Sequence, residues 1–386
     1  MTLRVFILAG EPSGDRLGGA LMEGLHELSP GVIFDGVGGP MMSAQGLTSQ
    51  FPMDELSIMG IAEVLPKYLH LKRRIREVAD AVIASKPDVL ITIDAPDFSL
   101  RVAKLVKKSS STRTVHYVAP SVWAWRPGRA KKMARVIDHV LALLPFEPKF
   151  MQAAGMDCDF VGHPVVAEKQ ATKSEIADFR TMTGLDDAPY VLALPGSRRS
   201  EVTRLAPVFG EALSGFLKSN TGMRVVVPAA APVAELVREN LQGWPGDVLV
   251  LDPSDYDNET AQAHKRAAFA SAELALAASG TVSLELAAAN TPMVIAYKFQ
   301  WLTWRIMKLM ALIDSVTLVN LVTCSRFVPE CLGPDCKAEN IVAALTKVAD
   351  DPEDQNRAMS LTMRQLGQGG EAPGLRAARA VLDRLP

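Results

Sequence analysis

Cysteine is scarce in this sequence and does not occur in the patterns of metal sites or disulfide scaffolds. The 386 residues include four cysteines, Cys158, Cys324, Cys331 and Cys336. None of them forms a C-x-x-C pair, and no histidine lies at zinc spacing from them. We therefore expect unpaired thiols, as in a reducing cytosol, and no metal site.

Long apolar runs are also missing. The run at residues 5–9 ends at Gly10 and Glu11, too early for the apolar region of a signal peptide. Nowhere do roughly 18 apolar residues follow one another without interruption, as a transmembrane helix requires. We expect a cytoplasmic protein that meets a membrane only peripherally, from its surface.

An excess of one charge is absent from the whole chain but present locally. Lys and Arg number 41 against 43 Asp and Glu, a formal net charge of -2, which argues against a general nucleic-acid binder. Between Phe98 and Ile137 there is no acidic residue. This indicates phosphate-bearing ligands or an anionic membrane surface, because a merely solvated helix face normally mixes both signs. The basic residues of this span are Arg101, Lys104, Lys107, Lys108, Arg113, Arg126, Arg129, Lys131, Lys132 and Arg135.

What the chain does have is a regular alternation of short apolar runs and helix-period segments. This alternation predicts βαβ units and mostly parallel sheets. Strands are expected in two series, at 4–9, 32–37, 88–93, 114–118 and 140–144, and then at 190–194, 224–228, 248–251, 274–277 and 293–296.

The two series predict an α/β protein of two Rossmann-like, doubly wound domains that face a central cleft. We expect an N-terminal domain at residues 1–165 and a second domain at 166–336. A helical tail at 337–386 is expected to pack back on the N-terminal domain. Open α/β sheets bind ligands at the carboxyl ends of their strands, so the loops there are the candidates for function.

Two loops of the first half carry carboxylates. The loop GEPSGD at 10–15 is neither G-x-G-x-x-G nor a Walker loop, which excludes the usual dinucleotide and ATP motifs. Ser13 is expected to cap the following helix, and Glu11 points to function unless the loop is an ordinary turn. Asp94 ends a buried strand, where desolvation can make it a general base, and Asp97 is expected to be a helix N-cap. The D-x-x-D spacing differs from the D-x-D of metal-dependent sugar transferases.

A third loop is rich in aromatic residues. Trp123 and Trp125 follow Pro120 and are followed by Arg126. Tryptophans in a loop pack or bind something, and a wall for a sugar ring and a packed domain edge both remain open.

The second half has two loops suited to anions. Gly196, Ser197 and Arg198 follow one strand, and the arginine could clamp a diphosphate. The segment Ser279, Gly280 and Thr281 follows another strand and leads into a helix bearing Glu285, which could accept hydrogen bonds from ribose hydroxyls. Together the loops predict a nucleotide-diphosphate site.

Two amphipathic segments, 59–76 and 297–312, combine an apolar side with basic residues. This pattern suits an interfacial helix, although an apolar stripe in an α/β protein usually belongs to the core. The candidate lipid contacts of the first segment are Ile61, Val64, Leu65 and Tyr68.

Taken in order, these loops resemble the motifs of the lipid-A-disaccharide synthase family over nearly the whole chain. The matching segments are GEPSGD at 10–15, IDAPDF at 93–98, YVAPSVWAWR at 117–126, LPFE at 144–147, FVGHP at 160–164, LPGSR at 194–198 and ASGT at 278–281. The resemblance implies an inverting glycosyltransferase of the GT-B type. It also implies a UDP-2,3-diacylglucosamine donor and a 2,3-diacylglucosamine 1-phosphate (lipid X) acceptor, with the β-1,6-linked lipid A disaccharide phosphate and UDP as products.

The resemblance also suggests roles for individual residues. Asp94 and Arg198 match the family's essential aspartate and arginine, and Asn320 matches an asparagine that activity requires. Glu285 occupies the usual ribose-binding place. The family asparagine generally follows Leu-Pro, whereas Val319 stands before Asn320 here. With Glu11 as a further catalytic candidate, we expect acceptor or lipid contacts from Ser13, Trp123, Trp125 and Arg126.

The implied chemistry needs no cofactor and no metal. Asp94 would deprotonate the acceptor hydroxyl, while Arg198 and the loop at 279–281 would stabilise the departing UDP. As further partners we consider the inner-membrane surface and a second copy of the chain, in a homodimer. Two alternatives stay open: another GT-B transferase or epimerase acting on a water-soluble UDP-sugar, and a non-catalytic nucleotide-sugar or membrane-surface binding protein.

Overall fold

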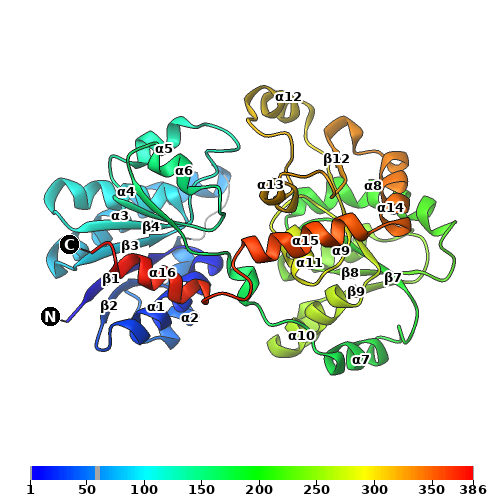
Figure 1. Ribbon diagram of the computed structural model, residues 1–386, viewed down its shortest axis with the longest axis horizontal. Helices are drawn as coiled ribbons and strands as arrows, with labels where there is room; N and C mark the ends of the chain where they lie inside the picture. Colours follow the sequence, from blue (N-terminus) through cyan, green and yellow to red (C-terminus); the bar gives the residue numbers. More distant parts are fainter. Residues whose placement is uncertain (1, 57–60, 386) are drawn as a thin grey trace. The chain divides into compact units, whose positions relative to one another are not determined.

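The computed structural model describes residues 2–56 and 61–385, with the side chains of 61–68, 301–303, 306 and 308 left aside. The chain forms two compact units (Figure 1). The first consists of Met1–Ala167 together with Leu366–Pro386, and the second of Glu168–Gln365. The expected domain border at residue 165 and the observed one after Ala167 fall in the same short segment. The expected tail at 337–386, in contrast, is divided between the two units.

The first unit is built on a parallel sheet with the strand order β2-β1-β3-β4-β5-β6. Apolar runs on both sides of the central strands are buried because helices cover both faces of the sheet. The strands are β1 (Arg4–Ala9), β2 (Ile33–Val37), β3 (Val89–Ile93), β4 (Arg113–Tyr117), β5 (His139–Ala142) and β6 (Asp157–Phe160).

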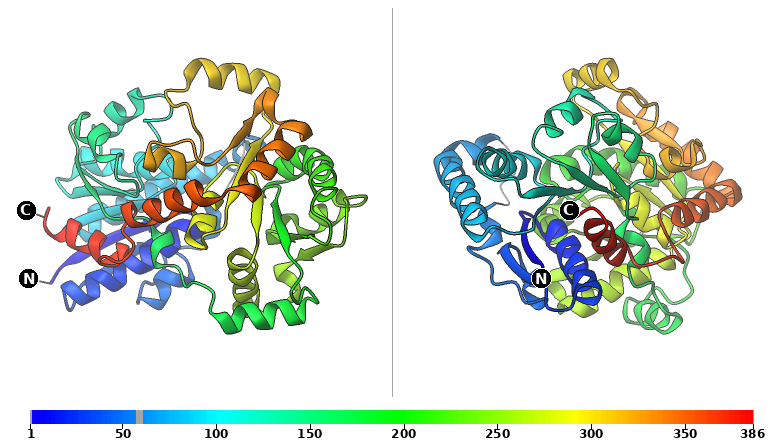
Figure 2. Two further views of the ribbon diagram at one scale, coloured as in Figure 1. Left: turned by 45° about the vertical axis from the view of Figure 1, so that its right-hand side comes forward. Right: turned by 60° about the vertical axis from the view of Figure 1, so that its left-hand side comes forward.

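The helices of the first unit come mostly from the connections between these strands. They are α1 (Pro12–Leu28), α2 (Pro40–Ala44), α3 (Ile61–Ser85), α4 (Pro96–Ser109), α5 (Gly128–Met133), α6 (Pro148–Gln152) and α16 (Pro373–Leu382), with 3₁₀ turns η1 (Met53–Glu55) and η2 (Pro164–Ala167). The last helix, α16, lies beside α1 (Figures 1 and 2). The end of the chain therefore completes the unit that its beginning starts.

The second unit repeats the plan with a parallel sheet ordered β12-β11-β10-β7-β8-β9. Its strands are β7 (Tyr190–Leu194), β8 (Arg224–Pro228), β9 (Val248–Leu251), β10 (Leu274–Ala277), β11 (Met293–Tyr297) and β12 (Glu330–Leu332). Its helices are α7 (Lys173–Met182), α8 (Arg199–Leu217), α9 (Ala234–Asn240), α10 (Asn258–Ala270), α11 (Val282–Ala288), α12 (Trp301–Met310), α13 (Leu318–Thr323), α14 (Ala338–Asp350) and α15 (Glu353–Gln365), with 3₁₀ turns η3 (Ala231–Val233), η4 (Pro253–Asp255) and η5 (Gly333–Asp335).

These two sheets confirm the predicted α/β class with two Rossmann-like, doubly wound parts. In each sheet the strand order reverses at one point, between β1 and β3 in the first unit and between β7 and β10 in the second. Ligands of open parallel sheets bind beyond the carboxyl ends of the strands at such a reversal. The two points place the Glu11 and Asp94 loops next to each other in one unit, and the Ser197 and Ser279 loops in the other.

Candidate functional site

The Asp94 loop and the Glu11 loop are in contact at the strand reversal of the first unit. β1 pairs with β3 so that Ala9 lies opposite Ile93, and the next residues of both strands leave the sheet together. A Cβ on Gly10 would lie 3.1 Å from the Cβ of Ala95. Glycine at position 10 thus lets the two loops approach closely.

Asp94 has an unusual backbone and a partly buried carboxyl group. Its φ is +48° and that of Ala95 is +43°, so two successive residues other than glycine adopt the left-handed conformation. The backbone is held by the Asp94 N–H, which donates to Tyr117 O at 3.0 Å, and by Ser99 Oγ, which donates to Asp94 O at 2.8 Å. Burial raises the pKa of the Asp94 carboxyl above its usual value, and an N–H of Ala95 opposes the rise.

The two predicted N-caps of this region are wrong by two residues. Helix α1 is capped by Glu11 and α4 by Ala95, because Pro12 and Pro96 take the first helical position in each. Ser13 therefore lies exposed in the first turn of α1, and Asp97 lies in the first turn of α4. Both residues lie close to the loops, but neither of them is the N-cap of its helix.

Asp15 of the same motif has a structural role. Its buried carboxylate accepts hydrogen bonds from the backbone N–H groups of Gly39 at 2.8 Å, Met41 at 2.9 Å and Met42 at 3.0 Å. It thereby satisfies the start of α2 and fixes the β2–α2 connection beside α1.

The loops after β4 and β5 are joined by a buried carboxyl group. Trp123 Nε1 donates to Glu147 Oε1 at 3.1 Å, and the other carboxyl oxygen accepts the N–H groups of Leu143 and Leu144. The Trp123 ring also meets Phe146 edge-on at 5.1 Å between centroids. Burial raises the pKa of the Glu147 carboxyl to about 7, opposed by these three N–H groups. No pattern in the sequence predicted a role for Glu147, although it ends the LPFE motif.

Trp125 and Arg126 stand together on the surface of the same loop. The guanidinium carbon of Arg126 lies 4.3 Å from the centroid of the Trp125 ring, and both residues are exposed. Trp123 is thus anchored inside the loop, whereas Trp125 and Arg126 are accessible to a ligand.

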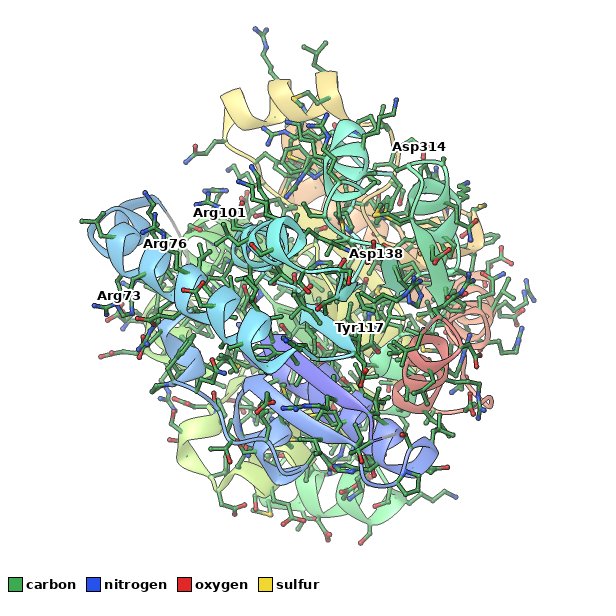
Figure 3. The ribbon with its side chains drawn as sticks, turned by 90° about the vertical axis from the view of Figure 1, so that its left-hand side faces the viewer. Arg73, Arg76, Arg101, Tyr117, Asp138 and Asp314 are labelled. Carbon is green, nitrogen blue, oxygen red and sulfur yellow. The ribbon has the colours of Figure 1, made fainter. Side chains whose placement is uncertain are left out.

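Many basic side chains of the first unit are exposed. In Figure 3, Arg73 and Arg76 of α3 and Arg101 of α4 extend on the same side of the unit. Further exposed residues on α4, on α5 and just after α5 are Lys104, Lys108, Lys131, Lys132 and Arg135. The predicted lipid contacts Ile61, Val64, Leu65 and Tyr68 fall on α3, but their side chains lie outside the described residues.

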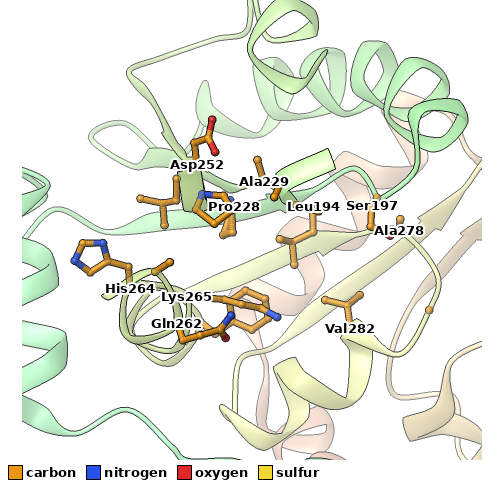
Figure 4. Close-up of a pocket in the computed structure, with 18 of the residues that line it drawn as sticks. Leu194, Ser197, Pro228, Ala229, Asp252, Gln262, His264, Lys265, Ala278 and Val282 are labelled. Atoms are coloured by element: carbon orange, nitrogen blue, oxygen red, sulfur yellow. The ribbon is translucent and has the colours of Figure 1, made fainter. Parts of the chain in front are cut away.

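The second unit contains a cavity of about 490 Å³ at its strand reversal (Figure 4). Gly196 and Ser197 after β7, and Ser279, Gly280 and Thr281 after β10, all line it. The two loops predicted as anion sites therefore meet at one cavity, and this cavity is formed within a single unit.

Arg198 is the N-cap of α8 at the edge of this cavity. Its side chain is 65% exposed, and its Nη1 lies 3.6 Å from Glu201 Oε1. Gly196 has a φ of +116°, a conformation that L side chains rarely adopt. The turn thus depends on glycine and leaves the Arg198 guanidinium able to reach a bound anion.

Glu285 is already paired in the described structure. Lys265 Nζ of α10 donates to Glu285 Oε2, and the same ammonium lies 5.4 Å from the centroid of Phe269. Lys265 lines the cavity, whereas the predicted ribose ligand Glu285 is not among the lining residues. No sequence pattern predicted that Lys265 lines the cavity, because it lies on α10 and not on α11, which carries Glu285.

The far end of the cavity consists of residues that the sequence did not single out. Pro228 and Ala229 lie at the end of β8, and Asp252 follows β9 (Figure 4). Tyr256 meets the His264 ring edge-on at 4.5 Å between centroids. The Nδ1 atom of His264 is buried and finds no hydrogen-bond partner among the described residues. This end of the cavity thus offers apolar walls and aromatic rings, whereas the His264 Nδ1 atom is buried away from the cavity.

Asn320 lies apart from the cavity lining and is fully buried in α13. Its Nδ2 donates to Val328 O at 2.9 Å, and its Oδ1 accepts the Val328 N–H at 3.0 Å. Both ends of the amide are therefore used to hold the segment before β12. This geometry favours a positioning role, and Val319 beside it is equally buried.

The loops predicted to be functional thus form one group in each unit, whereas Asn320 and Glu285 do not line the cavity. Asp94, Glu11 and the tryptophan loop lie at the carboxyl edge of the first sheet, and the two anion loops lie at that of the second. Across residues 2–56 and 61–385, no three His, Cys, Asp or Glu side chains form a group that could hold a metal ion. Among the described residues, no helix has the length and apolar character required to cross a membrane.

Solved structures with the same architecture include UDP-N-acetylglucosamine 2-epimerases. A UDP-GlcNAc 2-epimerase from Neisseria meningitidis bound to UDP-GlcNAc superposes with a TM-score of 0.64 at 12% identity, covering 100% of this chain and 99% of that one. A UDP-N-acetylglucosamine 2-epimerase structure from Listeria monocytogenes, described as putative in its title, gives 0.63 at 13% identity, covering 99% and 95%. At such low identity these likenesses establish the GT-B-type fold alone.

Sequence relatives are far more similar. A lipid-A-disaccharide synthase of Ruegeria pomeroyi is 67% identical over 384 residues, covering 100% of this chain and 96% of the relative. The corresponding protein of Rhodospirillum centenum is 44% identical over 389 residues, covering 99% and 94%. The family model for lipid-A-disaccharide synthetase matches residues 5–378. The chain therefore belongs to the lipid-A-disaccharide synthase family, the glycosyltransferases of lipid A biosynthesis.

Proposed function

We propose that this enzyme transfers 2,3-diacylglucosamine from its UDP derivative to the 6-hydroxyl of 2,3-diacylglucosamine 1-phosphate with inversion at the anomeric carbon. The observation that carries the proposal is Asp94, a partly buried carboxyl group with a raised pKa at the strand reversal of the first sheet. A carboxylate of this kind is suited to take a proton from an attacking hydroxyl group.

In the proposed step, the acceptor oxygen forms a bond to the anomeric carbon while its proton passes to Asp94. The bond from that carbon to the diphosphate oxygen breaks, and its electron pair leaves with UDP. An attack opposite to the leaving group produces the β-linkage, and Glu11 on the neighbouring loop would orient the acceptor. No metal and no cofactor takes part in this proposal.

The second unit would bind the UDP part of the donor. The cavity of about 490 Å³ falls within the range of small-molecule and cofactor sites. Arg198, with the backbone at Gly196, Ser197 and residues 279–281, would bind the diphosphate, since guanidinium groups and N–H donors suit phosphate oxygens. The charge that develops on departing UDP would be stabilised by the same groups.

The remaining lining of the cavity would take the nucleoside. Pro228 and Ala229 supply apolar walls for a flat base, and Tyr256 and His264 add aromatic rings to the lining. Lys265, held by Glu285, would reach the ribose or a phosphate. In this proposal Glu285 acts on the ligand mainly through Lys265.

The acyl chains of both substrates call for contact with a lipid surface. We place this contact on the exposed basic side chains of α3, α4 and α5, together with Trp125 and Arg126. On α12 of the second unit, Met307 and Leu309 are exposed beside Arg305, and Leu312 follows them. Basic residues beside exposed apolar ones favour the surface of an anionic membrane, here the inner membrane.

One assay tests the proposed function directly. The purified protein is incubated with UDP-2,3-diacylglucosamine and lipid X, with and without a chelator, and the disaccharide and UDP are measured. We expect equimolar products that are insensitive to the chelator, and proton NMR of the new linkage to show the β-configuration. Equal turnover with a deacylated donor would instead favour a transferase for water-soluble sugars, and no UDP release would favour a binding protein.

A further inference from the structure

The carboxylate of Glu201 occupies the loop that the diphosphate is proposed to use. Its Oε2 accepts the N–H of Ser197 at 3.2 Å, and its Oε1 lies 3.6 Å from Arg198 Nη1. The Glu201 side chain is only 12% exposed, although it lines the cavity. An acidic group of the protein thus contacts the same two donors that a phosphate would need.

Gly196 provides the space for this carboxylate. A Cβ at position 196 would lie 2.6 Å from both the Cβ and the Oε2 of Glu201. The glycine therefore serves two purposes: it permits the φ of +116°, and it leaves room for Glu201 beside the loop. The loop conformation itself therefore provides the space that the Glu201 carboxylate occupies.

A phosphate and the Glu201 carboxylate cannot share this place. Each carries negative charge, and the Ser197 N–H can direct its hydrogen at only one of them. Like charges that are close together in a partly desolvated site repel strongly. When a diphosphate binds, the carboxylate has to leave Ser197 N. It can keep its contact with Tyr297, whose Oη already donates to Glu201 Oε1 at 3.4 Å.

We propose that Glu201 is a built-in counter-anion that the diphosphate displaces. In the free enzyme it keeps the Ser197 N–H and Arg198 in position, and it lowers the affinity for UDP so that the product leaves readily. This inference rests on the proposed binding of UDP in the cavity, and it adds a group that competes with the ligand.

The test compares two substitutions at the same helical position. Glu201 is the third residue of α8, and Glu175 is the third residue of α7, where it accepts the N–H of Thr172 in a capping box. E201Q and E175Q remove the same charge from equivalent positions, but only the first lies at the cavity. Affinities for UDP and for uridine are measured by titration calorimetry, and folding is checked by thermal unfolding without ligand.

We expect E201Q to bind UDP about fivefold more tightly than the unaltered enzyme, the size of one partly exposed ion pair, and to bind uridine unchanged. E175Q should leave both affinities unchanged. UDP affinity that stays the same or falls in E201Q overturns the inference, because Glu201 would then only cap α8 or support the loop. If E201Q does not fold, E201D serves instead. It keeps an acidic residue in the first turn, but its side chain is one methylene shorter, which withdraws the carboxylate from Ser197 N, so it should also bind UDP more tightly.

The result separates this inference from the proposed function. If the unaltered enzyme does not bind UDP, the proposed function fails. If it binds UDP and neither E201Q nor E201D binds more tightly, only the role of Glu201 fails.

Discussion

At the scale of single residues, Asp94 combines burial with an uncommon backbone conformation. Left-handed φ values cost free energy for residues other than glycine, and two in succession persist only where surrounding contacts hold them. Here the backbone bonds to Tyr117 and Ser99 hold them. Strained backbone of this kind clusters at functional sites, which agrees with the role proposed for Asp94.

Asp94→Asn tests the role of this carboxyl group. Asparagine tolerates the left-handed region well, so the loop should keep its shape while the base is lost. We expect disaccharide formation to fall by at least about 10²-fold, the usual contribution of general-base catalysis, with unchanged UDP affinity. Retained turnover would exclude Asp94 as the base.

The raised pKa of Asp94 has two further consequences, one for the stability of the Asp94→Asn variant and one for the activity of the unaltered enzyme. Because the folded protein holds the Asp94 proton more tightly than the unfolded chain, ionised Asp94 lowers stability at neutral pH, and Asp94→Asn should unfold at an equal or higher temperature. The activity of the unaltered enzyme should fall, on acidification, at a higher pH than an ordinary aspartate would cause. Rate profiles and thermal unfolding across pH check both signs.

Arg198→Ala tests the diphosphate clamp, with Arg199→Ala as a matched control. Both arginines are exposed at the start of α8, but Arg198 is the N-cap beside the cavity. Losing a charge-assisted hydrogen bond of ~1.5–3 kcal/mol should weaken UDP binding by about 10- to 100-fold, whereas Arg199→Ala should change it little. Calorimetry that finds equal losses for the two variants would contradict a specific clamp.

At the scale of elements, the sequence predicted what depends on local pattern. β1 and β7–β10 begin and end where the apolar runs do. Helices bury most of these runs, and β9 at the sheet edge is half-buried. β6 was missed, since Asp157 and Asp159 interrupt its apolar pattern and pair with Arg113, His139 and Arg384. β12 was missed because it has three residues only.

Contacts between elements were beyond the reach of the sequence. The anion loops could be predicted because each follows a strand, but nothing local shows that Lys265 of α10 takes up Glu285 of α11. Nor does the motif around Asn320 reveal that its amide is consumed by the backbone of Val328. Side-chain pairs of this kind depend on the packing of separate helices.

Asn320→Ala tests whether this asparagine acts through its element. Removing the amide leaves the buried N–H and C=O of Val328 without their partner, which should cost roughly 1–3 kcal/mol of unfolding free energy. Activity should fall together with stability, and cooling should restore part of it. The exposed Asn340, whose amide donates to Asp335 O, supplies the control Asn340→Ala, which should alter neither quantity. An inactive Asn320→Ala with full stability would indicate direct contact with substrate.

At the scale of the whole molecule, the chain passes twice between its two units, after Ala167 and after Gln365. The tail was expected to return to the first unit from residue 337, but α14 and α15 stay in the second unit, and the chain returns at the glycine-rich joint at 367–370. What separates α16 from α14 and α15 is its packing against α1, a helix far from it in the sequence. A Cβ on Gly24 would lie 2.9 Å from Gly374 O, so two glycines face each other there.

Gly374→Ala tests whether this contact holds the first unit together. The added methyl group would lie 2.4 Å from Ala20 O, a backbone atom that cannot turn away, so α16 has to shift. We expect the first unit to lose about 1–3 kcal/mol of unfolding free energy, as in other overpacked sites. Gly128→Ala is the control, since a Cβ there meets no atom within 4 Å.

The UDP cavity is lined by the second unit alone, so UDP affinity should be unchanged in both variants. In calorimetric scans, UDP should raise the unfolding temperature of the unit that binds it and leave the transition weakened by Gly374→Ala where it is. A variant as stable as the control would contradict the close packing of α16 on α1, and a loss of UDP affinity would contradict the independence of the nucleotide site.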